Sequence, residues 1–474
     1  MASVFLNVTA VSPTGTGGYV TLWPTGYPKP PTSNVNFPAK AVVANLCLVD
    51  VDPTGAVSIL AGMIGPGLHV IVDVQGWISA DPLDAVGPSV SLAPAVPTAS
   101  DSVKAAEILA NAVRYLMGTW WAGPAQTLLA TPLTQTVPND AVRRLGMAAL
   151  GLSTAWATGV ADDPMTPIRA VTLIDRLASG HVTNASGGWG EGWQTSMWAA
   201  LAGRAAWYIW PQLSEACRAR VARMVAHEAD FAARYQIKYY RDATGNYLRN
   251  AAGTELIGDS GAEEVAWQGT AMQIALVMLP DHANAGIWST EMQRFALAAW
   301  ARPQDVAGWP QITGSNVETN GQVINHARIA PDYSTCIQFN VEAYSLFTLA
   351  GQATPQAMRQ FLGPVYAALN ALYVPGTAMV TYPQGCDWGT GQVLPYALAD
   401  AQALAYGYDS GSAAAYLGLH LDAVLAQQAR SADGRTYLTD NEYNYEGREE
   451  HTAQLAAQLW WTLLLRDLGL GSFS

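Results

Sequence analysis

The hydrophobic pattern divides the chain into two parts. Residues 1 to about 80 contain short runs of β-branched and aromatic residues, separated by clusters of Gly, Pro and Asn. The runs are SVFLNVTAV, GYVTLWP, AVVANLCLVDV, GAVSILAG and LHVIVDVQGWI. Short strands at regular spacing with turn residues between them predict a small all-β sandwich or barrel.

The pattern changes twice after this region. Residues 81–102 are rich in Pro, Ala and Ser and nearly uncharged, which predicts a semi-extended linker. From residue 103 to 474 apolar residues recur with the period of an α-helix, in roughly twelve segments. Many segments are apolar nearly all round, as in helices packed inside a larger assembly. Their number suits an all-α domain built as an (α/α) toroid of about six helical hairpins.

Composition narrows the possible functions. Half of the residues are hydrophobic, 13% are charged and the net charge is −13. This balance argues against nucleic acid or an anionic membrane surface as a partner. No apolar run reaches the length of a membrane span, and the first residues lack the pattern of a secretory signal.

Ligand patterns for metals and cofactors are missing from the sequence. The four cysteines are far apart without C-x-x-C spacing, and neither clustered histidines nor a Gly-rich phosphate loop occurs. We therefore expect no metal and no cofactor. Candidate chemistry then falls on the long polar connections between the helical segments, since binding residues usually lie on loops held by a rigid scaffold.

The first such connection, HVTNASGGWGEGWQTS, begins at His181. Its candidate substrate-binding residues are Trp189, Glu191, Trp193 and Gln194. A sugar ring has an apolar face that stacks on indole and a polar rim that bonds to carboxylates and amides. The alternative, a Gly-rich helix entry with its tryptophans in the core, stays open.

The second connection, GDSGAEEVAWQ, places Ser260 three residues before Glu263. That spacing predicts a capping box at the start of a helix. Glu264 points about 100° away from Glu263 on a helix, which makes Glu264 a candidate carboxylate catalyst or ligand. Glu263 and Trp267 are candidate substrate-binding residues of the same segment.

The third connection contains INHARIAPDY, with Asn325, His326 and Tyr333. An Asn amide that bonds to a substrate carboxylate acidifies the neighbouring C–H bond. A His can then remove that proton, and a Tyr can protonate the leaving oxygen. These three residues are sufficient for β-elimination on a uronic acid, although an Asn-His pair also occurs in ordinary surface turns.

Two further connections supply candidate ligands. YPQGCDWG contains Asp387 and Trp388, and EYNYEGREEH contains Arg448 and His451. Arg448 can anchor an anionic sugar group through two parallel hydrogen bonds. Hydrolysis of a glycoside by paired carboxylates is an open alternative, with acid/base candidates Glu191, Glu264, Asp332 and Asp387.

The motifs GGWGEGWQ, DSGAEEVAW, INHARIAPDY, YPQGCDWG and EYNYEGREEH, taken in this order, resemble the helical region of heparinase II/III-like proteins. The similarity spans about residues 103–470. It implies an incomplete (α/α) toroid with a cleft across one face and lyase activity on acidic polysaccharides. The family's Asn, His and Tyr roles fall on Asn325, His326 and Tyr333. Those lyases usually continue into a large β-sandwich, which this sequence does not show.

The N-terminal part, including FLNVTAVSPTGTGGYVTLWP and HVIVDVQGW, is similar to a small β-domain of actinobacterial surface proteins and of minor tail proteins of their phages. The resemblance implies a virion tail component that attaches to other tail proteins through this domain, with a homo-oligomer as one form. Three hypotheses follow: a glycan depolymerase acting on the host envelope polysaccharide, a non-catalytic glycan-binding protein, and a structural tail element. The sequence does not decide which glycan is the target.

Overall fold

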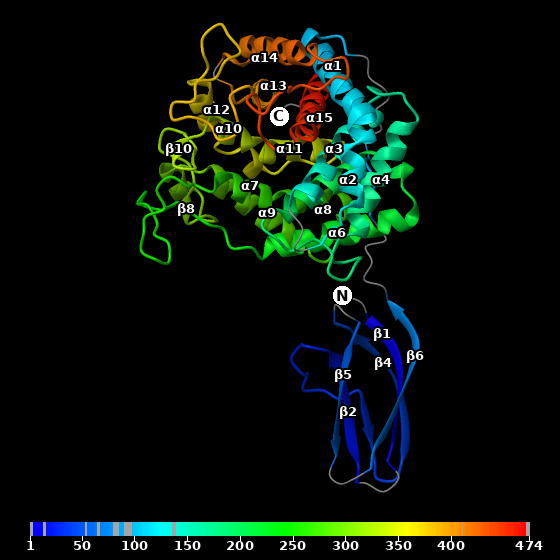
Figure 1. Cartoon of the computed structure of the whole chain (residues 1–474). Coiled ribbons are helices and arrows are strands. Elements are labelled where there is room, and N and C mark those ends of the chain that lie inside the picture. The colour runs from blue at the N-terminus through cyan, green and yellow to red at the C-terminus, as the bar shows by residue number, and fades with distance from the viewer. Residues whose placement is uncertain are drawn as a thin grey trace. The chain divides into compact units, whose positions relative to one another are not determined.

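The computed structural model describes residues 3–12, 16–52, 55–63, 67–78, 85–89, 97–134, 139–409 and 411–470. The chain divides into two compact units, Met1–Pro82 and Leu83–Ser474. The first consists of strands and the second mainly of helices (Figure 1). The prediction of a small all-β part followed by an all-α part is confirmed.

The described residues of the β unit form two antiparallel sheets of three strands each. One sheet has the order β4–β1–β6 and the other β3–β2–β5. The strands are β1 (Ser3–Val11), β2 (Gly18–Pro24), β3 (Val35–Phe37), β4 (Val42–Asp50), β5 (Val57–Met63) and β6 (His69–Ile78). Five of them match the five predicted runs. Strand β3 escaped prediction because its three residues are too few to show a period of two.

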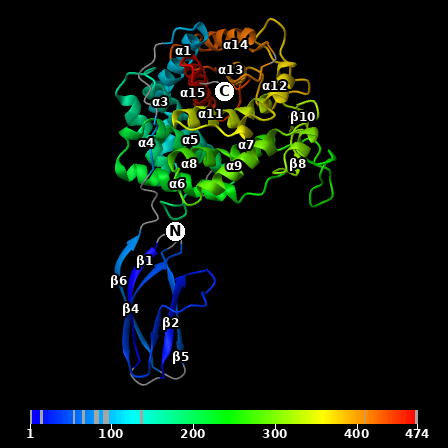
Figure 2. The ribbon, with the colours of Figure 1, turned by 180° about the vertical axis from the view of Figure 1, so that it is seen from behind.

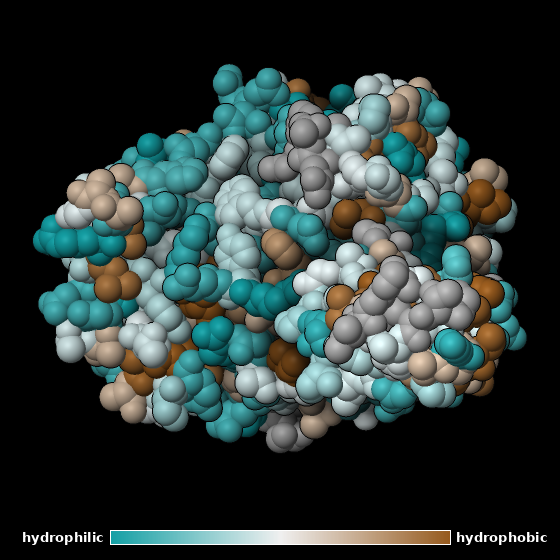
Figure 3. Space-filling view, turned by 90° about the horizontal axis from the view of Figure 1, so that it is seen from below, coloured by the Kyte–Doolittle hydropathy of each residue, from teal (hydrophilic) through white to brown (hydrophobic). Residues whose placement is uncertain are grey.

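Alternating side chains join the two sheets. Leu6, Val8 and Ala10 of β1 are buried in one cluster with apolar residues of β2, β3 and β4. Several apolar side chains of the unit stay exposed, among them Val74, of which 63% is accessible. On the face of the molecule shown in Figure 3, hydrophobic surface is scattered among polar surface.

The helical unit is built from helices of varied length. The α-helices are α1 (Ser100–Tyr115), α2 (Pro124–Ala130), α3 (Asn139–Ala157), α4 (Met165–Ser179), α5 (Thr195–Tyr208), α6 (Glu215–Ala233), α7 (Ala262–Gln268), α8 (Thr270–Met278), α9 (Ala285–Trp300), α10 (Pro331–Ser334), α11 (Gln338–Leu349), α12 (Leu362–Asn370), α13 (Leu394–Tyr406), α14 (Ala413–Gln428) and α15 (Arg448–Asp467). A π-helical turn, η1 (Leu116–Trp120), follows α1. The 3₁₀ turns are η2 (Trp210–Gln212), η3 (Pro303–Gly308), η4 (Thr335–Ile337) and η5 (Gln356–Arg359).

Two-residue strands form in the long connections. Strand β7 (Arg241–Asp242) pairs with β8 (Gly314–Ser315), and β9 (Ile324–Asn325) pairs with β10 (Arg328–Ile329). The second pair forms a hairpin within the predicted INHARIAPDY segment. Irregular polar stretches thus acquire fixed backbone hydrogen bonds.

Six helices contact one another in series. Helix α3 packs against α5, α5 against α8, α8 against α11, α11 against α13, α13 against α15, and α15 against α3. Helices α1, α4 and α6 each pack against two members of this series. In Figures 1 and 2, α11 and α15 lie toward the middle of the helical unit and α4, α6 and α14 at its outline. All residues of α5 are buried, as expected for a helix that is apolar nearly all round.

Part of the predicted linker belongs to the helical unit. Val86 N–H donates to the carbonyl of Met278 at the end of α8, and Ser89 N–H to that of Leu349 at the end of α11. Such terminal carbonyls lack a partner within their own helix. The Trp207 indole N–H donates to Val86 O at 3.0 Å. Residues 81–84 and 90–96 of the predicted linker lie outside the described residues.

Candidate functional site

A cavity of about 440 Å³ in the helical unit is lined by most of the predicted site residues. Its lining comes from α3, from the N-terminal ends of α5 and α7, and from the connections before α11, α13 and α15. Eleven predicted site residues meet there: Trp193, Gln194, Glu263, Glu264, Trp267, Asn325, His326, Asp332, Tyr333, Trp388 and His451. Connections that are far apart in the sequence therefore face one space.

The β9–β10 hairpin presents Asn325 and His326 to this cavity. The two central residues of its turn, His326 and Ala327, have left-handed φ angles of 49° and 60°. Positive φ at both central positions is the conformation that matches the twist of a tight hairpin, and residues other than Gly or Asn adopt it at a cost. Ala327 N–H donates to Gly258 O at 2.7 Å, and a Cβ on Gly258 would lie 2.9 Å from Ala327 Cα. The hairpin is therefore held against the segment that precedes α7.

Asn325 and Glu263 form a buried pair beneath the hairpin. The Asn325 Nδ2 group donates to Glu263 Oε1 at 2.5 Å, while Asn325 Oδ1 accepts the His326 N–H. Burial raises the pKa of Glu263 to about 8, and the charges of Glu264 and Asp259 act in the same direction. Glu263 is therefore largely a neutral acid at neutral pH. Its Oε2 atom is buried and has no partner among the described residues.

The capping box predicted from Ser260 and Glu263 does not form. Helix α7 begins at Ala262, and its N-cap is Gly261 in the left-handed conformation without a side-chain cap. The glycine moves the helix start one residue beyond the expected position. Glu263 is consequently released from a capping role and lines the cavity.

His326 is held by an acidic partner. Its Nδ1 lies 2.6 Å from Asp387 Oδ2, and Asp387 Oδ1 accepts from Arg328 Nη1 at 2.7 Å. A carboxylate acceptor fixes the proton on Nδ1, so the lone pair is on Nε2. Asp387 itself does not line the cavity, but it orients a residue that does.

Tyr333 lies beside His326, with 5.6 Å between the ring centroids. Burial raises the pKa of the Tyr333 phenol, which remains protonated through neutral pH. Burial also raises the pKa of the neighbouring Asp332 to about 6. The His326–Tyr333 pair thus sets a phenolic proton donor next to a nitrogen acceptor.

Aromatic side chains form much of the remaining wall. Trp193 is 45% exposed and meets Trp267 edge to face at 5.1 Å. On the other side Tyr443 and Tyr445 stack at 5.4 Å, and Trp388 meets Tyr445 at 5.7 Å. The exposed Trp193 ring and the half-buried Trp388 and Tyr445 rings provide flat apolar surfaces with polar edges.

Arg143 of α3 was not predicted as a site residue. It lines the cavity and pairs with Asp140 at 2.5 Å. Its guanidinium also stacks over the Tyr445 ring at 4.4 Å. Within the described lining Arg143 is the sole Lys or Arg. The motif DAVRR offers no signal for this role, because an arginine at the start of a helix is typical of a solvated helix face.

Other predicted residues lie outside the cavity lining. The Trp189 indole is 1% exposed and donates to Leu177 O at 2.8 Å, so this side chain belongs to the core. Glu191 bonds to His227 at 2.9 Å, and Arg448 pairs with Asp440 at 2.5 Å.

The predicted residue His451 does line the cavity. Burial lowers its pKa to about 3, so its imidazole stays neutral.

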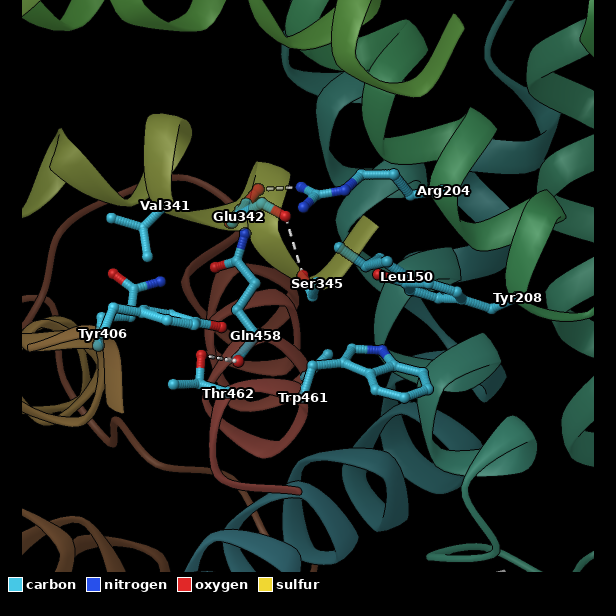
Figure 4. A pocket seen from close by; sticks show the side chains of 12 residues that line it. Leu150, Arg204, Tyr208, Val341, Glu342, Ser345, Tyr406, Gln458, Trp461 and Thr462 are labelled. Carbon is cyan, nitrogen blue, oxygen red and sulfur yellow. Dashed lines mark hydrogen bonds and ion pairs between the residues drawn. The ribbon is translucent and has the colours of Figure 1, made fainter. Parts of the chain in front are cut away.

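A much smaller cavity, of about 10 Å³, lies between α3, α5, α11, α13 and α15. Figure 4 shows the ion pair between Arg204 and Glu342 beside it, with Gln458 and Tyr406 facing the same space. Its volume suits one water molecule and excludes a larger ligand. The pair serves the core and not a binding site.

Within the described ranges no helix is long and apolar enough to cross a bilayer. In the same ranges no three His, Cys, Asp or Glu side chains are grouped so as to hold a metal ion.

No protein-family model matches the sequence, and no curated protein matches it. A solved structure of native E. coli alpha-2-macroglobulin (ECAM) is similar at a TM-score of 0.30 and 14% identity, over 97% of this chain and 26% of that chain. A similarity this low carries no argument about fold or function.

Proposed function

We propose that this protein binds and depolymerises an acidic polysaccharide by β-elimination in the 440 Å³ cavity. The observation that carries the proposal is the His326 imidazole. Its Nδ1 is tied to Asp387, and its ring lies beside the protonated phenol of Tyr333. A base and an acid are thus adjacent in one cavity.

The reaction begins at the carboxylate of a uronic acid residue. Asn325 and the neutral Glu263 provide hydrogen-bond donors without positive charge. Hydrogen bonds to the carboxylate withdraw electron density and acidify the C–H bond at C5.

His326 Nε2 then takes the C5 proton. The electron pair forms the C4–C5 double bond while the C4–O bond breaks. Tyr333 O–H protonates the leaving oxygen, so the chain is cut without consuming water. After product release His326 gives up the C5 proton to solvent and Tyr333 takes one proton from solvent, so both groups return to their starting forms.

We also propose that the helical unit is an (α/α) toroid of about six hairpins. The closed series of contacts among α3, α5, α8, α11, α13 and α15 supports this arrangement, since each helix touches the next and the last touches the first. A cleft at one end of such a series would be lined by the connections that precede its helices.

The β unit leads to a proposal about location. Its sequence similarity to the small β-domain of phage minor tail proteins supports attachment to other tail proteins, with the host envelope polysaccharide as the target. Immunogold labelling of virions tests this proposal directly, and absence of label from the tail would contradict it.

Glycoside hydrolysis is a second candidate, favoured by one observation. Asp259, Glu263, Glu264 and Asp332 all line the cavity, and Glu263 has the raised pKa of a general acid. A neutral acid facing a second carboxyl group is the arrangement that glycosidases use. In that case the substrate needs no carboxylate.

The deciding experiment incubates the protein with uronate-containing polymers and actinobacterial envelope glycans. Ultraviolet absorbance of the new double bond and the number of reducing ends are followed in parallel. We expect both to rise, and we expect His326→Ala and Tyr333→Phe to abolish both.

His227→Ala is the matched control, since His227 also pairs with a carboxylate, Glu191, but lies outside the cavity lining. Reducing ends without absorbance would assign the activity to hydrolysis. Binding without either signal would leave a glycan-binding protein.

A further inference from the structure

A second cavity, of about 640 Å³, lies on the other side of the β9–β10 hairpin. Ile324, Ala327 and Ile329 of the hairpin line it, whereas Asn325 and His326 line the first cavity. In the same way, Gly258 lines the second cavity and its neighbour Asp259 lines the first. The two cavities therefore share one thin wall.

The lining of the second cavity combines aromatic, aliphatic and amide groups. Tyr240 and Tyr247 meet edge to face at 5.1 Å, and Ile257 is 61% exposed. Asn320, Gln322 and Gln384 contribute amide side chains. Amides donate and accept hydrogen bonds at once, which matches the hydroxyl and acetamido groups of sugars.

The amide of Gln384 is oriented by the hairpin itself. Its Oε1 accepts the Ile329 N–H at 2.6 Å. Its Nε2 group makes no hydrogen bond in the described parts of the chain and stays available to a ligand. Gln384 also lies three residues before Asp387, which holds His326. The same segment thus supports both cavities.

Charge sets the kind of sugar that fits. Arg241 lies next to this cavity, but its guanidinium is bonded to Glu318 and stacked over Tyr247 at 3.8 Å. The described lining contains the Glu318 carboxylate and no Lys or Arg. Because Arg241 is already paired with Glu318, an anionic sugar would be desolvated here without meeting an unpaired cation in the described lining.

We propose that the second cavity binds uncharged sugar residues of the same polysaccharide whose uronate occupies the first. The proposal rests on the proposed function for the identity of the polymer, but binding of an uncharged sugar does not depend on catalysis. It implies a substrate in which uronates neighbour uncharged sugars and not a pure polyuronate. A volume of 640 Å³ is within the usual range of ligand cavities.

The test measures equilibrium binding of two uncharged probes, cellohexaose and hexa-N-acetylchitohexaose, to the full chain by titration calorimetry and saturation-transfer NMR. We expect at least one to bind. Gln322→Ala should weaken binding about fivefold to tenfold, the effect of one lost hydrogen bond. Thr319→Trp, which places an indole at the exposed rim of the cavity, should weaken it more.

Gln311→Ala is the matched control, because Gln311 is an exposed glutamine of the same connection that does not line the cavity. Tyr333→Phe should leave binding of the probes unchanged while it abolishes elimination. Failure of both probes to bind, or binding that responds to Tyr333→Phe and not to Gln322→Ala, would overturn the proposal. Gln322-sensitive binding without any elimination product would instead refute the proposed function alone.

Discussion

Replacing Glu263 by Gln tests whether this buried carboxyl is neutral in the folded protein. Gln has the same shape and keeps an oxygen that accepts from Asn325 Nδ2, but it cannot ionise. Folding raises the Glu263 pKa from an ordinary 4.5 to about 8, chiefly because burial penalises the charged form. The folded state therefore holds this proton more tightly than the unfolded chain does.

The direction of the pH effect follows from that difference. Well below pH 4.5 Glu263 is protonated in both the folded and the unfolded state, so its ionisation does not lower the free energy of unfolding. As the pH rises toward 8 the unfolded chain loses the proton first, and stability falls. The two pKa values differ by about 3.5, and each pH unit is worth about 1.4 kcal/mol, so the total loss is about 5 kcal/mol. The Glu263→Gln variant lacks this loss, so its advantage grows from about pH 5 to pH 8.

Urea unfolding at a series of pH values measures the difference between wild type and Glu263→Gln. Of the 17 tryptophans only Trp23 and Trp77 belong to the β unit, so intrinsic fluorescence reports mainly on the helical unit. The stability difference should increase steadily with pH, whereas Glu255→Gln, which changes an exposed carboxylate, should differ from wild type by less than about 1 kcal/mol throughout. A Glu263→Gln difference that does not change between pH 5 and pH 8 would refute the assignment of a neutral acid.

Three further outcomes are expected. Asp387→Asn should lower kcat for elimination about 100-fold with little change in KM, because His326 loses the acceptor that fixes its proton on Nδ1; an unchanged pH profile of kcat would count against this role. Glu342→Gln should destabilise the helical unit by about 3–5 kcal/mol, since it leaves Arg204 buried without its ionic partner. Denaturant unfolding measures this loss of stability, and a loss below about 1 kcal/mol would be inconsistent with a buried charged pair. KM for a uronate polymer should rise between pH 6 and pH 8. The pKa values of Asp332 and Glu263 are raised to about 6 and about 8, so these groups become negative in turn beside an anionic substrate. Initial rates over this pH range test the prediction, and a falling KM would contradict it.

The sequence predicts the strands and most helices well because each has a clear period. Strand β1 alternates buried Leu6, Val8 and Ala10 with more exposed neighbours, and α5 is apolar nearly all round and buried throughout. The grouping of the polar connections was also predictable, since polar residues between apolar helices gather where the helices end. The contacts of each loop residue could not be predicted, because they depend on the backbone turns of the loop.

Trp189 and Trp193 illustrate this limit. They lie four residues apart in one Gly-rich segment, and the sequence offers the same sugar-stacking argument for both. Gly190, with a φ of 142°, and Glu191, with a φ of 55°, redirect the chain between them. Trp189 is therefore buried against Leu177, while Trp193 is exposed in the cavity.

The polar groups at the cavity are mostly uncharged or acidic. This composition determines whether they would stabilise the bound substrate or the transition state of the proposed reaction. A cation placed on the substrate carboxylate would stabilise the ground state strongly, because the carboxylate is already charged when it binds. Catalysis depends instead on contacts that become stronger in the transition state. In the proposed elimination, neutral donors such as Asn325 and protonated Glu263 would gain most as negative charge accumulates on the carboxylate oxygens during removal of the C5 proton. In the proposed reaction Arg143, already paired with Asp140 and stacked on Tyr445, would guide the substrate, while the uncharged pair would act on the reacting group.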